Sequence, residues 1–201
     1  MKKIIPYALC LALCACSATQ VIDTNDSTAV SSMQHVMELE YRDWTNTAEK
    51  MTKSMLESGA LSTEQKPVIA IGKIVNDTAQ RFDTDILTKK ILTTLLKSGK
   101  AQIATNFSGE DTTSNNVRTL RDNGEYNQAT IAQKGTLIAP NMSMSGKMLQ
   151  RNLQLKSGWF SSNDTRVEYY LQLTLTDLKT GLSVWEDEQP IIKEGDHAPT
   201  W

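Results

Sequence analysis

The amino-terminal segment constrains this chain more than any other, because it removes the cysteines and decides where the rest can fold. Lys2 and Lys3 precede an apolar stretch at residues 4–13. This stretch is too short for a transmembrane helix, which needs about 20 apolar residues, and is typical of a secretory signal. Residues 13–16 read Leu-Cys-Ala-Cys, which is the order of residue types in a lipobox. An ordinary signal peptide cut nearby is the alternative, but the order favours cleavage before Cys16 and a lipid on its thiol.

Cleavage limits the chemistry of the mature protein. Removing 15 of the 201 residues leaves 186, which is enough for one domain with one substantial core. Cys10 and Cys14 leave with the signal and Cys16 carries the lipid, so the domain has no disulfide, thiol nucleophile or cysteine ligand. Ser17 follows the acylated residue, and by resemblance to sorted lipoproteins this favours the outer membrane, with the domain facing the periplasm.

The segment after the lipidated cysteine is polar. Residues 17–33 are rich in Ser, Thr, Asp, Asn and Gln and bury too little apolar surface to offset the entropy of ordering, which predicts a flexible tether. We therefore expect a signal at residues 1–15, the lipidated cysteine and tether at 16–39, and a globular domain at 40–201. Loss of two lysines with the signal changes the net charge of −2 to −4, and no basic stripe follows, which excludes nucleic acid as a partner.

The first half of the domain predicts a helix, a strand, a second helix and a returning strand. Asn46 and Glu49 have the spacing of a capping box for a helix that stops at Gly59, with Tyr41 and Trp44 packed beneath it. Residues 67–75 are an almost continuous apolar run, which predicts a strand buried on both faces. The second helix spans residues 83–98 and has one apolar face, formed by Ile86, Leu87, Ile91, Leu92, Leu95 and Leu96. Residues 101–105 predict a parallel returning strand, because such crossovers are nearly always right-handed and parallel.

The second half turns to strands. Short helices are expected at residues 116–121 and 127–134, followed by extended chain at 137–155. Residues 166–178 alternate cleanly, with five apolar side chains on one face: Val167, Tyr169, Leu171, Leu173 and Leu175. A tight hairpin at residues 179–181 leads to a last strand at 182–189. The pattern predicts a single α/β domain with a mixed sheet flanked by helices.

The residues that could carry enzymatic chemistry form no catalytic or metal-binding pattern. His35 and His197 lie near the two ends of the mature chain and outside any metal-ligand spacing, so we expect solvated side chains. No Gly-x-Ser-x-Gly nucleophile elbow or phosphate-binding loop is present. Asp83 and Asp85 could form a carboxylate pair, but a helix cap and first-turn charge explain them better. We predict a protein that is not an enzyme and needs neither cofactor nor metal.

Two aromatic residues stand out as candidate binding residues. Trp159 and Phe160 lie in a polar hairpin at residues 156–165. They either form a hot spot for a partner or fold back over the end of the core, and the sequence favours neither. Three methionines at alternating positions are expected in the core rather than around a cofactor: Met142, Met144 and Met148.

Three blocks together with the lipobox resemble the LpoB-type outer-membrane lipoproteins. The blocks are residues 41–44 (Tyr-Arg-Asp-Trp) with Met51 and Met55, residues 66–77 with the helix that ends at 98–100, and residues 170–175 with 180–181 and 184–185. The resemblance implies a fold similar to the N-terminal domain of TolB. It also implies a monomer without enzymatic activity that crosses the peptidoglycan mesh and activates a class A penicillin-binding protein. This chain departs from the family in lacking a long proline-rich tether and in the longer hairpin with Trp159 and Phe160.

Two other classes of function remain as alternatives. A structural or secretion-associated outer-membrane lipoprotein of the curli-pore or flagellar type shares a similar domain and would form ring-shaped oligomers. A cell-wall hydrolase would degrade peptidoglycan alone, and the lack of a catalytic pattern argues against it.

Overall fold

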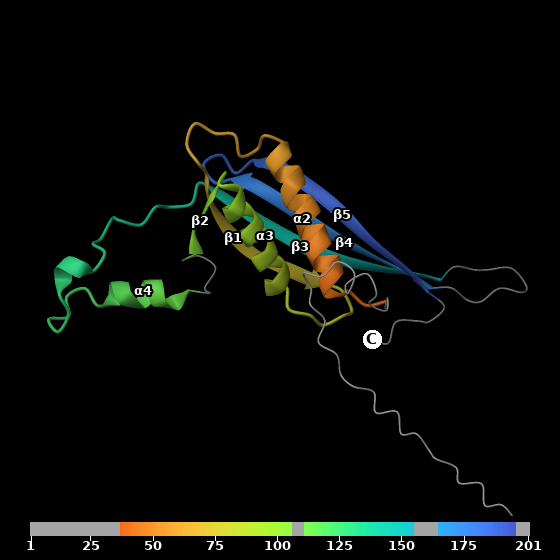
Figure 1. The fold of residues 1–201 in the computed structure, drawn as a ribbon, viewed down its shortest axis with the longest axis horizontal. Coiled ribbons are helices and arrows are strands. Elements are labelled where there is room, and N and C mark those ends of the chain that lie inside the picture. The colour runs from red at the N-terminus through yellow and green to blue at the C-terminus, as the bar shows by residue number, and fades with distance from the viewer. Residues whose placement is uncertain (1–36, 106–110, 155–164, 196–201) are drawn as a thin grey trace, which may run out of the picture. The chain divides into compact units, whose positions relative to one another are not determined.

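The protein forms one mixed five-stranded sheet with two helices packed on it (Figure 1). A computed structural model describes residues 37–105, 111–154 and 165–195, which belong to one compact unit. The elements in chain order are α2 (Tyr41–Glu57), β1 (Val68–Asp77), α3 (Asp85–Ser98), β2 (Gln102–Ile103), α4 (Thr112–Thr119), the 3-10 helix η2 (Gln128–Thr130), β3 (Met142–Gln154), β4 (Thr165–Asp177) and β5 (Ser183–Gly195). The strand order is β2-β1-β3-β4-β5, parallel among the first three strands and antiparallel from β3 to β5. The predicted α/β fold class and the parallel return of β2 are confirmed, while similarity to TolB stays a prediction.

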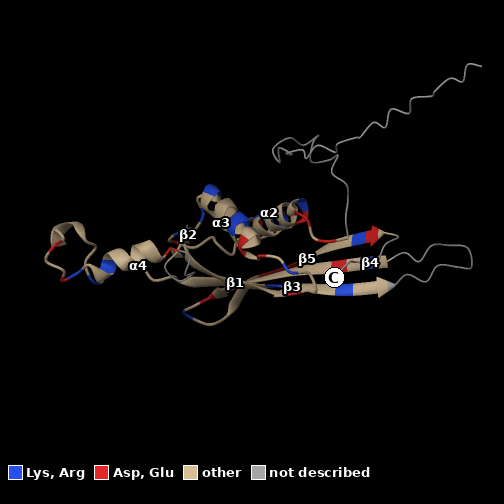
Figure 2. Cartoon of the chain, turned by 90° about the horizontal axis from the view of Figure 1, so that it is seen from below, with Lys and Arg blue, Asp and Glu red and all other residues tan. Residues whose placement is uncertain are grey.

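The core lies between α2, α3 and one face of the sheet (Figure 2). On β4, the five apolar side chains predicted to share a face are all at most 1% exposed. The three methionines of β3 are also buried in this core, as predicted. The helices contribute Met51 and Met55 from α2, and Leu87, Ile91 and Leu95 from α3.

The expected burial of β1 on both faces is wrong. Its buried side chains are Ile69, Ile71 and Ile74, whereas Val75 is 53% exposed. The described helices that pack on the sheet, α2 and α3, lie on the same face. An apolar run such as that of β1 therefore does not by itself imply that helices cover both faces of the strand. The pairing of β1 with β3 is also irregular between Ile71 and Ile74.

The helix boundaries show where local sequence signals compete. The predicted capping box at Asn46 and Glu49 is wrong, because α2 begins earlier, with the Glu40 and Asp43 side chains each bonded to the other residue's backbone. Tyr41, expected to pack under the helix, is its first residue and is 52% exposed, whereas Trp44 is buried. The predicted stop at Gly59 is confirmed, since this residue has a φ of 81°.

The second helix begins slightly later than predicted. The Asp83 carboxylate accepts a hydrogen bond from the amide of Asp85, the first residue of α3, at 2.9 Å, although the N-cap residue itself is Thr84. Gly99 ends the helix with a φ of 66°. The expected single apolar face is wrong at two positions, because Ile86 and Leu96 are half exposed.

Between β2 and β3, one of the two predicted helices forms. The short helix expected around residues 116–121 is confirmed as α4, although α4 begins and ends earlier, whereas the helix expected at 127–134 is wrong, because only the single turn η2 forms there. The Gln128 side chain bonds the carbonyls of Leu120, Asn123 and Tyr126, and such side chain–backbone bonds compete with a helix ladder. None of the residues of α4 is buried.

The last strand is longer than predicted, because Pro190 does not end it. β5 pairs with β4 alone, and an edge strand tolerates a proline whose missing N–H faces away from the ladder. Pro190 lies opposite Tyr170, and pairing continues to Gly195 opposite Thr165. Among the described residues, no helix is long and apolar enough to span a bilayer.

Residues 37–40, where the chain enters the domain, are fastened to the end of the sheet at which β5 finishes. The Lys193 ammonium donates to the Glu38 carbonyl at 2.6 Å, and it lies 2.6 Å from the Asp43 carboxylate and 3.5 Å from that of Glu40. The Tyr169 hydroxyl donates to the Met37 carbonyl at 3.2 Å. We call these contacts the entry latch.

The latch predicts a large cost for removing its cation. The side chains of Lys193 and Asp43 are only 11% and 14% exposed, so Lys193→Met leaves a nearly buried carboxylate without its partner. We expect the free energy of unfolding to fall by about 3 kcal/mol in urea titrations. Lys147→Met, which breaks the exposed pair with Asp77, is the control and should cost less than about 1 kcal/mol. Equal losses would show that the latch contributes no more than a surface ion pair.

The latch also predicts a pH dependence. Burial, and secondarily the nearby charges of Glu38 and Asp43, raise the pKa of Tyr169 well above its ordinary value of 10. Below pH 10 the phenol is protonated in both the folded and the unfolded chain; above it the unfolded chain loses its proton first, so stability falls. Tyr169→Phe should lose about 1 kcal/mol at pH 7, from the hydrogen bond, and should weaken the decline between pH 10 and 11. Tyr126→Phe is the control, and an unchanged alkaline decline in Tyr169→Phe would contradict the assignment.

Candidate docking surface

The helices α2 and α3 lie on one side of the sheet and leave its opposite face without a helix from either of them (Figure 2). No other described helix packs on this face, which we call the open face. Its centre is formed by four apolar or aromatic side chains: Leu149 of β3, Tyr170 of β4, and Pro190 and Ile192 of β5. The sheet register places Leu149 opposite Tyr170 and Tyr170 opposite Pro190, so three of these residues form one row across three strands. Ile192 is 55% exposed and adjoins this row.

The aromatic residue of the open face is held by a charged network. The Tyr170 hydroxyl donates to the Glu168 carboxylate at 2.5 Å, and this hydrogen bond is the main cause that raises the Tyr170 pKa. Glu168 is buried although it lies on the face without helices, and the Arg166 guanidinium approaches it at 3.9 Å while also pairing with Glu194. The contacts fix the hydroxyl end of Tyr170 while its ring remains partly exposed.

The rim of the open face is polar, and its side chains are paired. Lys147 forms an ion pair with Asp77 at 2.6 Å, and the Gln172 amide donates to Glu188 at 2.7 Å. An apolar and aromatic centre inside a polar rim is the arrangement of protein–protein interfaces, in which central aromatic residues contribute most of the binding energy. The open face is therefore suited to bind another protein.

Most residues of the predicted aromatic hairpin lie between β3 and β4 in the sequence. Trp159 and Phe160 lie outside the described residues, so their role stays a prediction, and the same holds for lipidation of Cys16 and for His35 and His197. The strands that flank the hairpin are described, and Gln154 pairs with Thr165, which pairs with Gly195. Residues 155–164 therefore connect two adjacent strand ends at the end of the sheet that also bears the entry latch.

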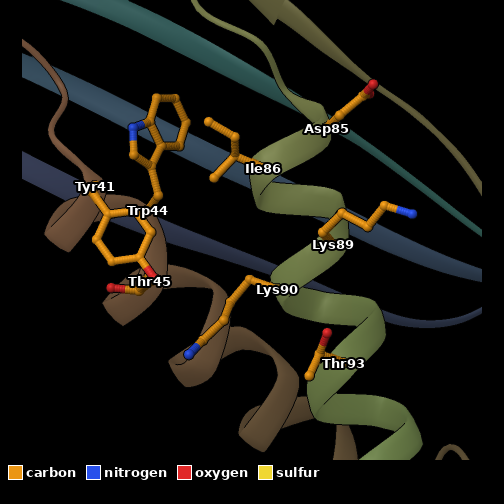
Figure 3. A pocket seen from close by; sticks show the side chains of 8 residues that line it. All are labelled: Tyr41, Trp44, Thr45, Asp85, Ile86, Lys89, Lys90 and Thr93. Atoms are coloured by element: carbon orange, nitrogen blue, oxygen red, sulfur yellow. The ribbon is translucent and has the colours of Figure 1, made fainter. Parts of the chain in front are cut away.

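A second surface is a groove between the two helices (Figure 3). We call it the helix groove; it has a volume of about 430 Å³, with Tyr41 and Trp44 on α2 facing Ile86 and Lys90 on α3. Trp44 also packs on Phe82 with ring centroids 4.1 Å apart, which makes the floor rigid. The Lys90 ammonium is paired with the Glu49 carboxylate at 2.6 Å.

The helix groove combines aromatic and aliphatic side chains with hydroxyl and charged groups. Its hydroxyl groups belong to Tyr41, Thr45 and Thr93, and no histidine or cysteine lines it. Thr45 donates its hydroxyl hydrogen to the Arg42 carbonyl. In the ranges that the structure describes, no group of His, Cys, Asp or Glu is placed to hold a metal ion.

Sequence reasoning missed the centre of the open face. The alternation of β4 puts Glu168, Tyr170 and Gln172 on the side away from its apolar face, and in the sequence Tyr170 stands out only within the block at residues 170–175. Its significance depends on Leu149 and Pro190, which become its neighbours only through strand register. The one available signal was a tyrosine between polar residues on the outer face of an alternating strand.

The comparisons with known proteins bear on the whole domain. Residues 43–191 match the model of a family described as the peptidoglycan-synthase activator LpoB. No curated protein matches the chain closely enough to count as a relative.

Similar solved structures include the C-terminal domain of LpoB from Escherichia coli, at 14% identity over 74% of this chain and 98% of that one, with a TM-score of 0.43. The corresponding domain from Salmonella enterica has 15% identity over the same shares and the same score. The structure of LpoB from E. coli in solution has 10% identity over 96% of this chain and 91% of that one, with a TM-score of 0.41. The family assignment does not depend on these three structures.

Proposed function

The chain belongs to the LpoB family of peptidoglycan-synthase activators, and from this membership we propose that it binds and activates a class A penicillin-binding protein. The family regulates synthases and is not itself enzymatic. We further propose that acyl chains such as palmitate on Cys16 hold the protein in the outer membrane, with its domain facing the periplasm.

The observation that carries the proposal is the extent of the family match. It begins within α2 and ends within β5, so it includes most of α2, all of α3, β1 to β4, most of β5 and three of the four central residues of the open face: Leu149, Tyr170 and Pro190. The lipobox at residues 13–16 supports the anchor, and the open face supports a protein partner rather than a small substrate.

The proposed mechanism is allosteric. Docking of the domain favours an active state of the synthase, and coupling of this kind is typically about 1–3 kcal/mol, or roughly 5–150-fold. We propose that the contact combines the open face with the neighbouring hairpin, in which Trp159 and Phe160 act as aromatic anchors. The contact supplies no catalytic group, so the rate gain depends on differential binding to the two states of the synthase.

The first prediction concerns activation and the hairpin. Glycan-strand synthesis from lipid II by purified class A synthases of the host should rise several-fold when the domain starting at Ser17 is added. The variant with Trp159→Ala and Phe160→Ala should lose this rise. A rise that survives both changes would place the interface elsewhere and keep the function. No rise with any synthase, from a domain shown to be folded, would favour the structural or secretion-associated lipoprotein, and degradation of purified peptidoglycan by the domain alone would favour the hydrolase.

The second prediction concerns the open face. Tyr170→Ala should weaken binding to the synthase about tenfold in calorimetric titrations, because it removes an aromatic side chain from the centre of the contact. Tyr170→Phe keeps the ring and should retain most of the affinity. Tyr41→Ala, which removes a more exposed tyrosine from the helix groove, is the control and should bind like the unchanged domain. Normal binding by Tyr170→Ala together with loss in the hairpin variant would restrict the contact to the hairpin.

A further inference from the structure

The cationic side chains of the open face gather on β3. Leu149, at the centre of the face, lies on this strand between Lys147 and Arg151. Because alternate residues of a strand point to the same side, both cationic side chains lie on the open face with Leu149. Lys147 is paired with Asp77, whereas Arg151 is exposed and forms no ion pair within residues 37–105, 111–154 and 165–195. The β3 side of the open face therefore carries an uncompensated cation.

The β5 side of the open face is anionic. Glu186, Glu188 and Glu194 are exposed and lie on the same side of β5 as Pro190. Glu188 accepts its hydrogen bond from the Gln172 amide, which is neutral and leaves the charge of the carboxylate uncompensated. Glu186 has no cationic partner in the part of the chain that the structure describes. The two outer strands of this three-strand surface thus differ in the sign of their charge.

Tyr170 lies between the cationic and the anionic side. Its strand, β4, separates β3 from β5, and strands of a sheet lie about 4.8 Å apart, so the two charged sides are roughly 10 Å from each other. The pKa of Tyr170 is raised mainly by its hydrogen bond to Glu168, and two weaker influences on this pKa oppose each other: Arg151 lowers it and Glu188 raises it. The Tyr170 hydroxyl is therefore close enough to both rims to be affected by their charges.

A partner that covers Tyr170 also removes water from the charges beside it. Charges that lose water without gaining an opposite charge disfavour an interface, and like charges set opposite each other disfavour it strongly. A stable contact therefore needs carboxylates where it meets Arg151 and cationic groups where it meets Glu186 and Glu188. The same partner turned by half a turn in the plane of the sheet would place like charges together, so this charge order admits one orientation and rejects the reverse.

We propose that the open face binds a surface of the synthase on which carboxylates and cationic groups flank an apolar centre on opposite sides. The carboxylates face β3 and the cationic groups face β5, and this order fixes the orientation in which the synthase docks. The inference rests on the proposed function and adds to it the chemistry of the partner's surface. A surface with charges of a single sign would be repelled at one side of the open face.

A fixed orientation also determines which part of the synthase approaches residues 155–164. The strand ends that flank these residues, Gln154 and Thr165, lie at one end of the open face. Docking the opposite way round would bring a different part of the synthase to that end. Electrostatic attraction acts during the encounter, before the apolar side chains touch, so the charge order selects the productive complex early.

Exchanging two charges tests the orientation without changing the net charge of the domain. In the double variant Arg151→Glu with Glu188→Lys, the cation and the anion change places across Tyr170. The rate constant for association with the purified synthase, measured by surface plasmon resonance at low ionic strength, should fall about tenfold. The matched control is Lys53→Glu with Glu57→Lys, which exchanges an exposed ion pair on α2 and should alter the rate less than about twofold.

The two single reversals test the sign of the charges on the partner. Arg151→Glu and Glu188→Lys should each slow association, because each sets like charges opposite each other. Lys53→Glu and Glu57→Lys change the net charge by the same amounts and are the controls for long-range effects of total charge. At an ionic strength of about 1 M, where charges are screened beyond about 3 Å, the differences between the variants should largely disappear.

Three results would overturn the proposal. An exchange variant that associates as fast as the unchanged domain would show that charge order is irrelevant. Single reversals with opposite effects, one slowing and the other speeding association, would show a partner surface of one sign. A second copy of this chain carries the same charge order, so a dimer detected by sedimentation equilibrium without synthase, weakened by each single reversal and kept by the exchange, would assign the open face to self-association.

Failure of the proposed function gives a different result. An unchanged domain that binds no class A synthase would remove the function and this inference together, whereas normal binding that is insensitive to all these changes removes only the inference. The four substituted side chains are exposed, so the fold should persist. Circular dichroism and the melting temperature of each variant must match those of the unchanged domain before the rates are compared.

Discussion

Burial of one side of β4 is the interaction on which the other layers depend. This strand pairs along its length with β3 and β5, and its five inward apolar side chains are almost completely inaccessible to solvent. At about 25 cal/mol per Å² of apolar surface, burying each large side chain contributes on the order of 2 kcal/mol. No cysteine follows Cys16 in the sequence, so no disulfide within the domain can take the place of this burial. The two helices can lie on one face because β4 gives them a continuous apolar surface there.

Because α2 and α3 pack on one side of the sheet only, its opposite face and its two edge strands, β2 and β5, have no helix from either of them. The uncovered face carries a tyrosine whose hydroxyl is fixed by Glu168, itself held by Arg166. A network of this kind reduces the side-chain entropy lost on binding, which favours a preformed contact surface over a merely solvated one. The two edge strands differ in what prevents them from pairing with another strand. β5 carries charged side chains and a proline, whereas β2 is only two residues long. Both edges are therefore protected against pairing with another strand, one by its side chains and the other by its length.

Sequence reasoning predicted the features that repeat and missed those that depend on register or competition. The period-two pattern of β4 and the glycines after α2 and α3 were sufficient to predict the mixed α/β sheet, because each is a local signal that tertiary contacts reinforce. The helix expected at residues 127–134 failed because Gln128 bonds the backbone instead. The start of α2 was misplaced because the spacing of a capping box occurs twice, at Glu40 with Asp43 and at Asn46 with Glu49, and the first pair is the one that Lys193 contacts. Tyr170 could not be recognised as a site, since its neighbours come from other strands.

The entry latch fixes the end of the sheet from which the domain is attached. The latch lies where Thr165 pairs with Gly195, whereas Gln102 pairs with Val68 beside the start of β3. These two ends of the sheet are separated by the length of β3, which at about 3.3 Å per residue is roughly 40 Å. Because Met37 and Glu38 are bonded to Tyr169 and Lys193, the chain that precedes the domain starts from the latch end whatever path it follows. The open face extends along the strands from that end, so the proposed docking surface begins close to the point at which the domain is attached.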